Sequence, residues 1–279
     1  MLRIGLSSNG FTHDDEFFSG VINAGITDIE ISRSYYDELI GFDFNNVMKL
    51  SAKHGVNICS FHLPFAHDVQ YCLEALDGEL RKSSVEYFKD LVKRAGDVGI
   101  KNIVIHGSSE PIKQEERSEK LKFSKDGLFQ LAQTAKTAGC IIAVENLPRT
   151  CLGNTSKELK DMISVDENLK VCFDFNHLLK ESHYEFIKEL GDKIVSTHVS
   201  DYDFVDERHW LPGEGDIKWK EVYPLFIGCG YKGVFLYEVP VTIDTLERTR
   251  PLSFDDYVLN AKEIFSGSKL TVLPTVRKV

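Results

Sequence analysis

The sequence lacks an excess of basic residues, a long apolar segment and paired cysteines. Its 279 residues include 33 Lys and Arg against 43 Asp and Glu, which argues against a polyanionic partner such as nucleic acid. No apolar run approaches the roughly 18 residues of a membrane span, and the start, MLRIGLSSNG, predicts a strand and a turn rather than a signal peptide. The six cysteines form no Cys-x-x-Cys pair. We therefore expect a cytoplasmic protein with reduced, mostly buried cysteines.

The sequence does contain an alternation of short apolar segments and amphipathic segments, repeated eight times. The apolar segments predict strands at 3–8, 28–32, 57–63, 102–106, 140–144, 170–173, 194–199 and 234–237. The amphipathic segments predict helices at 14–24, 44–54, 79–98, 120–138, 157–163, 183–190, 219–227 and 254–265. Ser156 and Ser253 are the expected N-caps of the fifth and eighth helices.

Apolar strands that alternate with helices predict a parallel sheet that is buried on both faces. Eight such units predict a (β/α)8 TIM barrel of the α/β class, a single domain over residues 1–267 that leaves 268–279 as an unassigned C-terminal tail. An open doubly wound sheet is the alternative, but no Gly-x-Gly-x-x-Gly follows the first strand. In a barrel, the functional site lies at the carboxyl ends of the strands.

Six consecutive predicted strands end in a histidine or a carboxylate: His62, His106, Glu145, Asp174, His198 and Glu238. A single histidine at such a position is more often a hydrogen-bonding residue than a ligand, and a single carboxylate can cap the following helix. Three carboxylates in one barrel mouth, however, repel one another unless a cation or protons neutralise them. One histidine with three carboxylates is an oxygen-rich set that suits Mn²⁺, Mg²⁺ or Co²⁺ and leaves positions for substrate oxygens.

Five short motifs resemble those of the xylose-isomerase-like barrel superfamily, which includes sugar isomerases, sugar epimerases and endonuclease IV. They are VEN at 144–146, FDFNH at 173–177, HVSD at 198–201, ERHWLPGEGD at 207–216 and YEV at 237–239. The resemblance implies one divalent metal ion (Mn, Mg, Co or Zn) with the ligands Glu145, Asp174, His198 and Glu238. In the ketose 3-epimerase branch, the two glutamates also move the substrate proton, and the counterpart of His177 contacts the substrate.

The resulting hypothesis is a metal-dependent sugar or sugar-phosphate isomerase or epimerase. A metal that binds a carbonyl and the adjacent hydroxyl acidifies the C–H bond between them and stabilises an enediolate. Glu145 and Glu238 would remove and return that proton as the catalytic pair. The expected substrate contacts are His62, His106, His177, Arg208, His209 and Trp210, with Trp210 stacking on a sugar face or merely packing. Arg149 and Arg208 are either contacts for a phosphate or carboxylate, or solvated surface charges.

The same motifs also resemble endonuclease IV, which cleaves abasic DNA with three zinc ions. Its further ligands would fall on His62, His106, His177, Glu207 and His209, with Glu207 in place of that family's Asp. The strand-end loops SSNGFTHDDE, LPFAHDVQ and SDYDFVDE are acidic, whereas a nuclease that binds a duplex favours basic loops. This favours a small sugar over nucleic acid as the partner.

A third hypothesis is a barrel that binds a sugar or metal without turnover, or that acts only with a partner subunit. The complete set of acidic residues and histidines argues against a decayed site. A homo-oligomer is compatible with the sequence, and no membrane partner is expected.

Overall fold

Eight parallel strands form one sheet that closes into a barrel. The computed structural model describes residues 2–33, 41–65 and 71–278. The strands are β1 (Arg3–Ser7), β2 (Asp28–Ser32), β3 (Asn57–His62), β4 (Asn102–His106), β5 (Ile141–Glu145), β6 (Leu169–Asp174), β7 (Ile194–His198) and β8 (Val234–Tyr237). From β1 to β7 each strand pairs with the next in sequence, and β1 pairs with β8. Between β7 and β8, the Val199 N–H donates to the Leu236 carbonyl at 2.7 Å and closes the ring.

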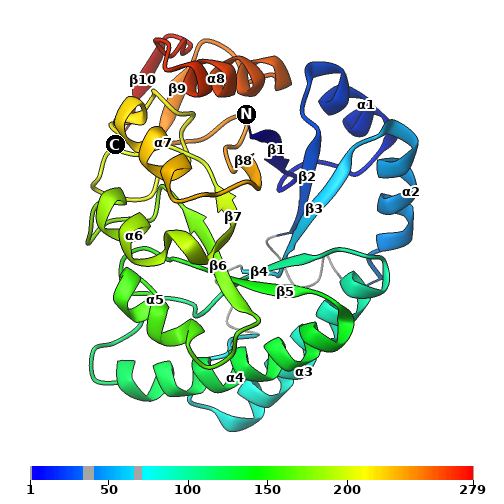
Figure 1. Cartoon of the computed structure of the whole chain (residues 1–279), viewed down its shortest axis with the longest axis vertical. Coiled ribbons are helices and arrows are strands. Elements are labelled where there is room, and N and C mark those ends of the chain that lie inside the picture. The colour runs from blue at the N-terminus through cyan, green and yellow to red at the C-terminus, as the bar shows by residue number, and fades with distance from the viewer. Residues whose placement is uncertain (1, 34–40, 66–70, 279) are drawn as a thin grey trace.

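The helices surround the strands, as Figure 1 shows, and their bounds are close to those predicted. They are α1 (Asp15–Ala24), α2 (Phe44–His54), α3 (Gly78–Asp97), α4 (Arg117–Ala138), α5 (Ser156–Ile163), α6 (His183–Leu190), α7 (Trp219–Gly228) and α8 (Phe254–Ser266), with the short 3-10 helix η2 (Gly191–Lys193) before β7. The predicted (β/α)8 barrel, a single domain of the α/β class, is therefore confirmed.

The start of α5 and the start of α4 differ from their predictions, whereas the N-cap of α8 agrees. The N-cap of α5 is Thr155 rather than Ser156, because the Thr155 hydroxyl accepts from the Glu158 N–H while Ser156 is already helical. Ser253 does cap α8, in a capping box with Asp256. Helix α4 begins at Arg117, three residues before its predicted start, and its N-cap position makes no side-chain hydrogen bond.

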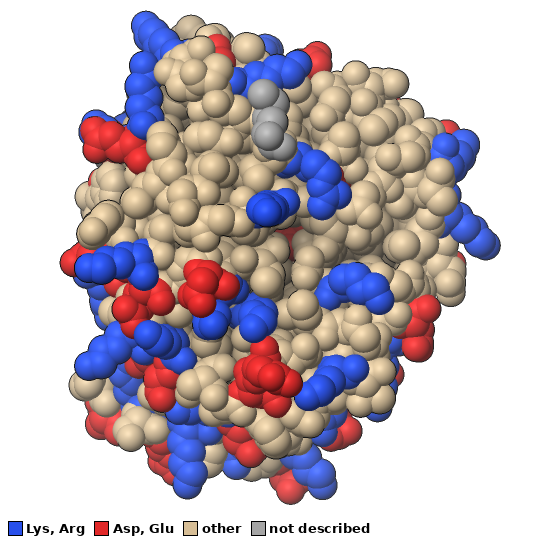
Figure 2. All heavy atoms as spheres, in the orientation of Figure 1, with Lys and Arg blue, Asp and Glu red and all other residues tan. Residues whose placement is uncertain are grey.

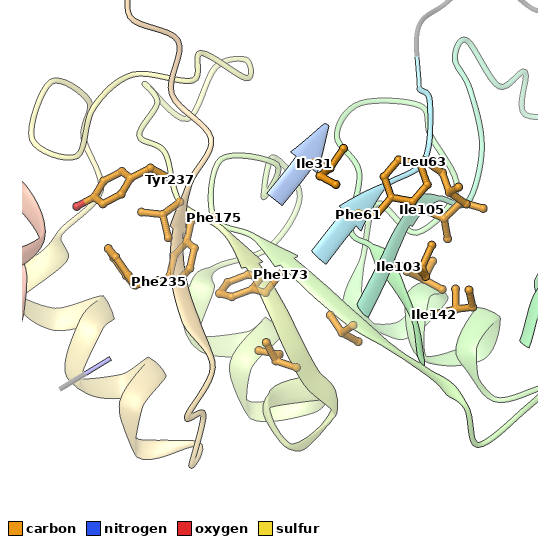
Figure 3. Close-up of a cluster of buried hydrophobic side chains, with 14 of the residues drawn as sticks. Ile31, Phe61, Leu63, Ile103, Ile105, Ile142, Phe173, Phe175, Phe235 and Tyr237 are labelled. Atoms are coloured by element: carbon orange, nitrogen blue, oxygen red, sulfur yellow. The ribbon is translucent and has the colours of Figure 1, made fainter. Parts of the chain in front are cut away.

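The main core lies between the barrel strands and the surrounding helices. Figure 3 shows two groups of its side chains on the strands or just beyond their ends: Phe173, Phe175, Phe235 and Tyr237 on one side, and Ile31, Phe61, Leu63, Ile103, Ile105 and Ile142 on the other. Inside the barrel a small separate cluster contains Val104, Ala143 and Cys172. Alternation of side chains along each strand thus sends bulky residues outward and leaves an interior in which polar strand-end residues meet.

The tail, which has no predicted structure, carries a further strand. Strand β10 (Thr275–Arg277) pairs antiparallel with β9 (Leu246–Arg248), beyond β8. The Arg277 guanidinium donates to the Glu214 carbonyl at 2.8 Å and pairs with Asp216 at 3.0 Å. The small antiparallel sheet β9–β10 therefore packs against the loop between β7 and α7, which carries part of the candidate site.

Two composition-based expectations can be compared with the structure. All six cysteines are free, four of them buried and two partly buried, as predicted. In the part of the chain that is described, no helix has the length and apolar character needed to cross a membrane. Lys and Arg side chains are scattered among Asp and Glu side chains on the face shown in Figure 2.

Candidate metal centre and adjoining cavity

Four strand-end residues converge at the carboxyl end of the barrel. Glu145, Asp174 and His198 are the last residues of β5, β6 and β7, and Glu238 directly follows β8. One ligand atom from each lies within 4.8 Å of the others. The strand register contributes to this arrangement, because Asp174 lies opposite His198 in the parallel pair β6–β7. The structure thus brings together the four residues named as metal ligands from the sequence.

The donor atoms of this group fit a divalent cation. Asp174 Oδ2 and His198 Nδ1 are buried without a hydrogen-bond partner among the described residues, although His198 Nδ1 lies 3.2 Å from Glu145 Oε2 and 3.4 Å from Glu238 Oε2. Burial, together with Glu145 and Glu238 and against the effect of His177, raises the pKa of Asp174 to about 7. Buried polar atoms nearly always have a hydrogen-bond partner. Two buried ligand atoms without one, next to carboxylates, therefore indicate a position for a cation with oxygen and imidazole ligands.

Glu145 is surrounded by four histidines, of which His62, His177 and His198 are buried and His106 is partly exposed. Its Oε2 lies 3.1 Å from His62 Nε2 and 3.4 Å from His106 Nε2, and its Oε1 lies 3.3 Å from His177 Nδ1. Burial raises the pKa of Glu145, but His198, His106 and His177 more than reverse this, so that it lies well below its ordinary value. Glu145 is therefore ionised at neutral pH and can act as a ligand.

Glu30, in the middle of β2, was not identified from the sequence. Its side chain is fully buried, its Oε1 lies 3.0 Å from His198 Nε2, and its Oε2 accepts from the Ser60 hydroxyl at 2.7 Å. A carboxylate on the far nitrogen of a ligand histidine fixes the ring and makes its other nitrogen a better donor. The available signal was the alternation in DIEIS, which places Glu30 on the opposite face of the strand from Ile29 and Ile31.

A second group of candidate ligands lies beside the first: His177, Glu207 and His209, which also offer atoms within 4.8 Å of one another. His177 Nε2 lies 3.2 Å from Glu207 Oε2, and its Nδ1 lies 2.9 Å from the Asn146 carbonyl. Burial lowers the pKa of His177, but Asp174, Glu145 and Glu207 raise it well above its ordinary value. His177 thus contacts the buried carboxylates on one side, and together with Glu207 and His209 it forms part of the cavity wall.

The loop that carries Glu207 and His209 is held by one buried carboxylate. Asp201 accepts from the Gly213 and Ile217 N–H groups at 2.7 and 3.0 Å and from the Trp219 indole at 2.9 Å. Gly215 passes so close that a Cβ there would lie 2.3 Å from Asp201 Oδ1. The segment 212–215 therefore turns closely around the Asp201 side chain, which anchors the loop that carries His209.

Two adjoining hollows lie beside the candidate ligands Glu145 and Glu238. One has a volume of about 100 Å³ and includes His106, Glu145, His177, Glu207, His209 and Glu238 in its wall. The other, of about 160 Å³, is more apolar and is lined in part by Val239, Pro240 and Ile243. Phe65, His209 and Glu238 border both. A small elongated molecule could thus contact both glutamates while its ends occupy the two hollows.

Three of the residues predicted to contact substrate do not border either hollow in the described structure. His62 is fully buried behind Glu145. The Arg208 side chain donates to Asp203 at 2.9 Å. Trp210 is fully buried, its indole N–H donates to Thr245 at 3.0 Å, and its ring lies 4.8 Å from the Arg277 guanidinium. Trp210 therefore packs between its loop and the β9–β10 sheet, whereas His106, His177 and His209 face the cavity.

A family model described as a xylose isomerase-like TIM barrel matches residues 20–252. Among curated relatives, an uncharacterized protein of Methanocaldococcus jannaschii is 29% identical over 69% of this chain and 67% of its own length. A probable endonuclease 4 of Acholeplasma laidlawii is 28% identical over 69% of this chain. The chain spans 61% of the length of that second relative.

Solved structures share the fold at low sequence identity. A D-tagatose 3-epimerase-like protein superposes with a TM-score of 0.77 and 22% identity, over 95% of this chain and 97% of its own. A D-psicose 3-epimerase from Clostridium cellulolyticum H10, determined with D-tagatose, gives a TM-score of 0.73 and 21% identity, over 87% and 86% of the two chains. These similarities establish a common architecture over nearly the whole chain.

Proposed function

The chain belongs to the xylose isomerase-like TIM barrel family, and on that premise we propose that it is a divalent-metal-dependent isomerase or epimerase of a sugar or sugar phosphate. The observation that carries the proposal is the convergence of Glu145, Asp174, His198 and Glu238, with two unpaired buried donor atoms, beside a cavity. The similarity to solved structures of sugar epimerases is consistent with this reaction class.

Glu145 and Glu238 are the proposed proton-transfer pair. They come from β5 and from the end of β8, and both border the same hollow. A divalent ion bound to the four ligands would polarise the substrate carbonyl and adjacent hydroxyl and stabilise an enediolate. One glutamate then removes the proton from the carbon beside the carbonyl, and the other donates a proton to the opposite face. His106, His177 and His209 hold substrate hydroxyls, and the buried walls limit the access of water to the enediolate.

The test is proton exchange with solvent. A panel of ketoses, inososes and their phosphates is incubated with the metal-loaded protein in D₂O, and deuterium is sought by NMR at the carbon next to the carbonyl of any substrate that reacts. Glu145→Gln and Glu238→Gln keep the size and an oxygen donor while removing the base. Each should lose about 10²- to 10⁴-fold in turnover, with metal content measured in parallel. Metal-loaded Gln variants with near-normal turnover would exclude this pair.

An endonuclease IV-like phosphodiesterase is the second candidate, because His177, Glu207 and His209 form a further group with metal-ligand spacing. Against it, Glu207 Oε1 lies 3.2 Å from an Arg149 guanidinium nitrogen, so this carboxylate already has a cationic partner. The two candidates differ in stoichiometry. The epimerase requires one metal per chain and no incision of duplex DNA at abasic sites, whereas three zinc ions and efficient, salt-sensitive incision would favour the nuclease.

A further inference from the structure

Arg149, at the edge of the more polar hollow, is surrounded by three carboxylates. Its Nε donates to the two oxygens of Glu110 at 3.0 and 3.1 Å, and an NH2 hydrogen also bonds Glu110. Its NH1 group donates to Asp206 at 2.7 Å, and NH2 lies 3.2 Å from Glu207 Oε1. All three guanidinium nitrogens thus have a carboxylate partner within the protein.

The arrangement joins three loops that are far apart in the sequence. Glu110 follows β4, Arg149 follows β5, and Asp206 follows β7. The Arg149 backbone is held at φ 46°, in the left-handed region, and its carbonyl accepts from the Asn154 side-chain amide at 2.8 Å. This conformation is unfavourable for a residue with a Cβ, so it is maintained by its surroundings. The backbone at Arg149 is therefore held by its neighbours, and its guanidinium lies against the three carboxylates.

Arg149 is the one Lys or Arg side chain that borders either hollow in the described parts of the chain. The undescribed segments, 34–40 and 66–70, contain no Lys or Arg in the sequence. A phosphoryl group in this cavity would therefore meet a guanidinium whose three nitrogens already contact carboxylates, together with the carboxylates of Glu110 and Glu207. Binding of a phosphate by arginine usually needs two parallel free N–H donors.

We infer that Glu110 and Asp206 are specificity-determining residues, which hold Arg149 so that this hollow rejects phosphoryl groups and accepts the hydroxyls of an uncharged sugar. This inference rests on the proposed sugar function and narrows its substrate class. A carboxylate accepts hydrogen bonds from hydroxyls and repels phosphate oxygens, so the same acidic groups account for both properties. Glu110 contributes the larger share, because both of its oxygens contact Arg149.

The test removes the carboxylate charge and titrates the metal-loaded protein with inorganic phosphate by isothermal calorimetry at constant ionic strength. Glu110→Gln and the double variant with Asp206→Asn should each bind phosphate about tenfold or more tightly than the wild type, because charge-assisted donors become available. Adding Arg149→Met to Glu110→Gln should abolish the gain, which separates this hollow from phosphate binding at the metal. Asp203→Asn is the matched control. It removes one charge from the same loop, but Asp203 pairs with Arg208.

Each outcome decides the inference. Gains confined to the Glu110 and Asp206 variants support it. Tight phosphate binding by the wild type that Arg149→Met removes would overturn it, because Arg149 would then be a phosphate ligand. Equal binding by the wild type and the variants would also overturn it, provided thermal unfolding shows that the variants are folded. An equal gain in phosphate affinity in Asp203→Asn would contradict the inference, because the effect would then come from the overall charge of the loop.

The phosphate titration stands apart from the test of the proposed function. If the protein turns over a ketose, kcat/KM for the free sugar should exceed that for its phosphate ester, and Glu110→Gln should reduce this ratio about tenfold or more. If no sugar reacts at all, the proposed function fails, while the titration still shows whether Glu110 and Asp206 keep phosphate out of the hollow.

Discussion

His177, in the barrel mouth, and His183, at the start of α6, are equally buried, but their pKa values are shifted in opposite directions. Each is 5% exposed. Burial lowers the pKa of His183 to about 4, since its ring lies among Phe173, Phe175 and Phe204. Burial has the same effect on His177, but Asp174, Glu145 and Glu207 reverse it and raise the pKa well above its ordinary value.

The comparison shows that two equally buried histidines have opposite pKa shifts in this molecule, because only one of them has neighbouring carboxylates. Nδ1 of His177 lies within 3.6 Å of carboxylate oxygens of both Glu145 and Asp174, and Nε2 lies 3.2 Å from Glu207. His183 Nε2 instead donates to the Phe175 carbonyl at 2.9 Å. A concentration of negative charge inside a protein requires protons or a cation, so the barrel mouth is suited to a metal and the surroundings of His183 are not.

Removal of a proposed ligand should have the largest effect and tests the comparison directly. Asp174→Asn keeps the shape, and its Oδ1 can still accept from the Asn176 N–H, but it loses the charge. His198→Ala removes an imidazole donor. Bound metal, measured by plasma mass spectrometry after dialysis, should fall to a small fraction of the wild-type value in both. His183→Gln, at a buried histidine outside the mouth, should retain full metal content. Undiminished metal in both mouth variants would contradict the ligand assignment.

Glu30→Gln should have an intermediate effect, because Glu30 acts on a ligand rather than as one. Its carboxylate lies 3.0 Å from His198 Nε2, and glutamine keeps an acceptor there without the charge. Loss of such a partner typically weakens metal binding about 10- to 100-fold. The affinity can be measured by competition with a chelator, and activity at saturating metal should recover in part. Glu74→Gln is the control, since Glu74 is a buried carboxylate that accepts from the Ser109 N–H, outside the candidate metal groups. Equal losses in both variants would assign Glu30 a general structural role.

The sequence predicted those parts of the site that depend on the strand pattern. Residues at the ends of consecutive strands must meet in a barrel, so the positions of Glu145, Asp174 and His198 followed from strand assignment alone. Contacts that depend on side-chain direction did not follow. Trp210 has the same local sequence whether it faces a cavity or packs beneath Arg277. The cluster around Arg149 brings together residues from three loops whose conformations no periodicity specifies. Likewise, the tail pairs with β9 through backbone hydrogen bonds, which leave little trace in its side-chain pattern.

The smallest expected effect is the contribution of His183 to the pH dependence of protein stability, and it tests the comparison with His177. In the unfolded chain its imidazole takes up a proton as pH falls through about 6.5, whereas in the folded protein it stays neutral down to about 4. The unfolded state therefore binds more protons in this interval, and His183 makes the protein less stable as pH falls from about 6.5 to about 4. One group contributes a slope of at most about 1.4 kcal/mol per pH unit.

His183→Gln keeps an N–H donor for the Phe175 carbonyl but cannot titrate. At neutral pH the variant should be less stable than the wild type, because the glutamine packs less well against the surrounding aromatic rings. Toward pH 5 the difference should shrink, since the wild type alone carries the His183 titration. Urea unfolding of the metal-loaded proteins at several pH values measures both effects. If the pH dependence of stability is the same in the wild type and the variant, the pKa of His183 is not lowered in the folded protein. The contrast with His177 would then rest on the carboxylates around His177 alone.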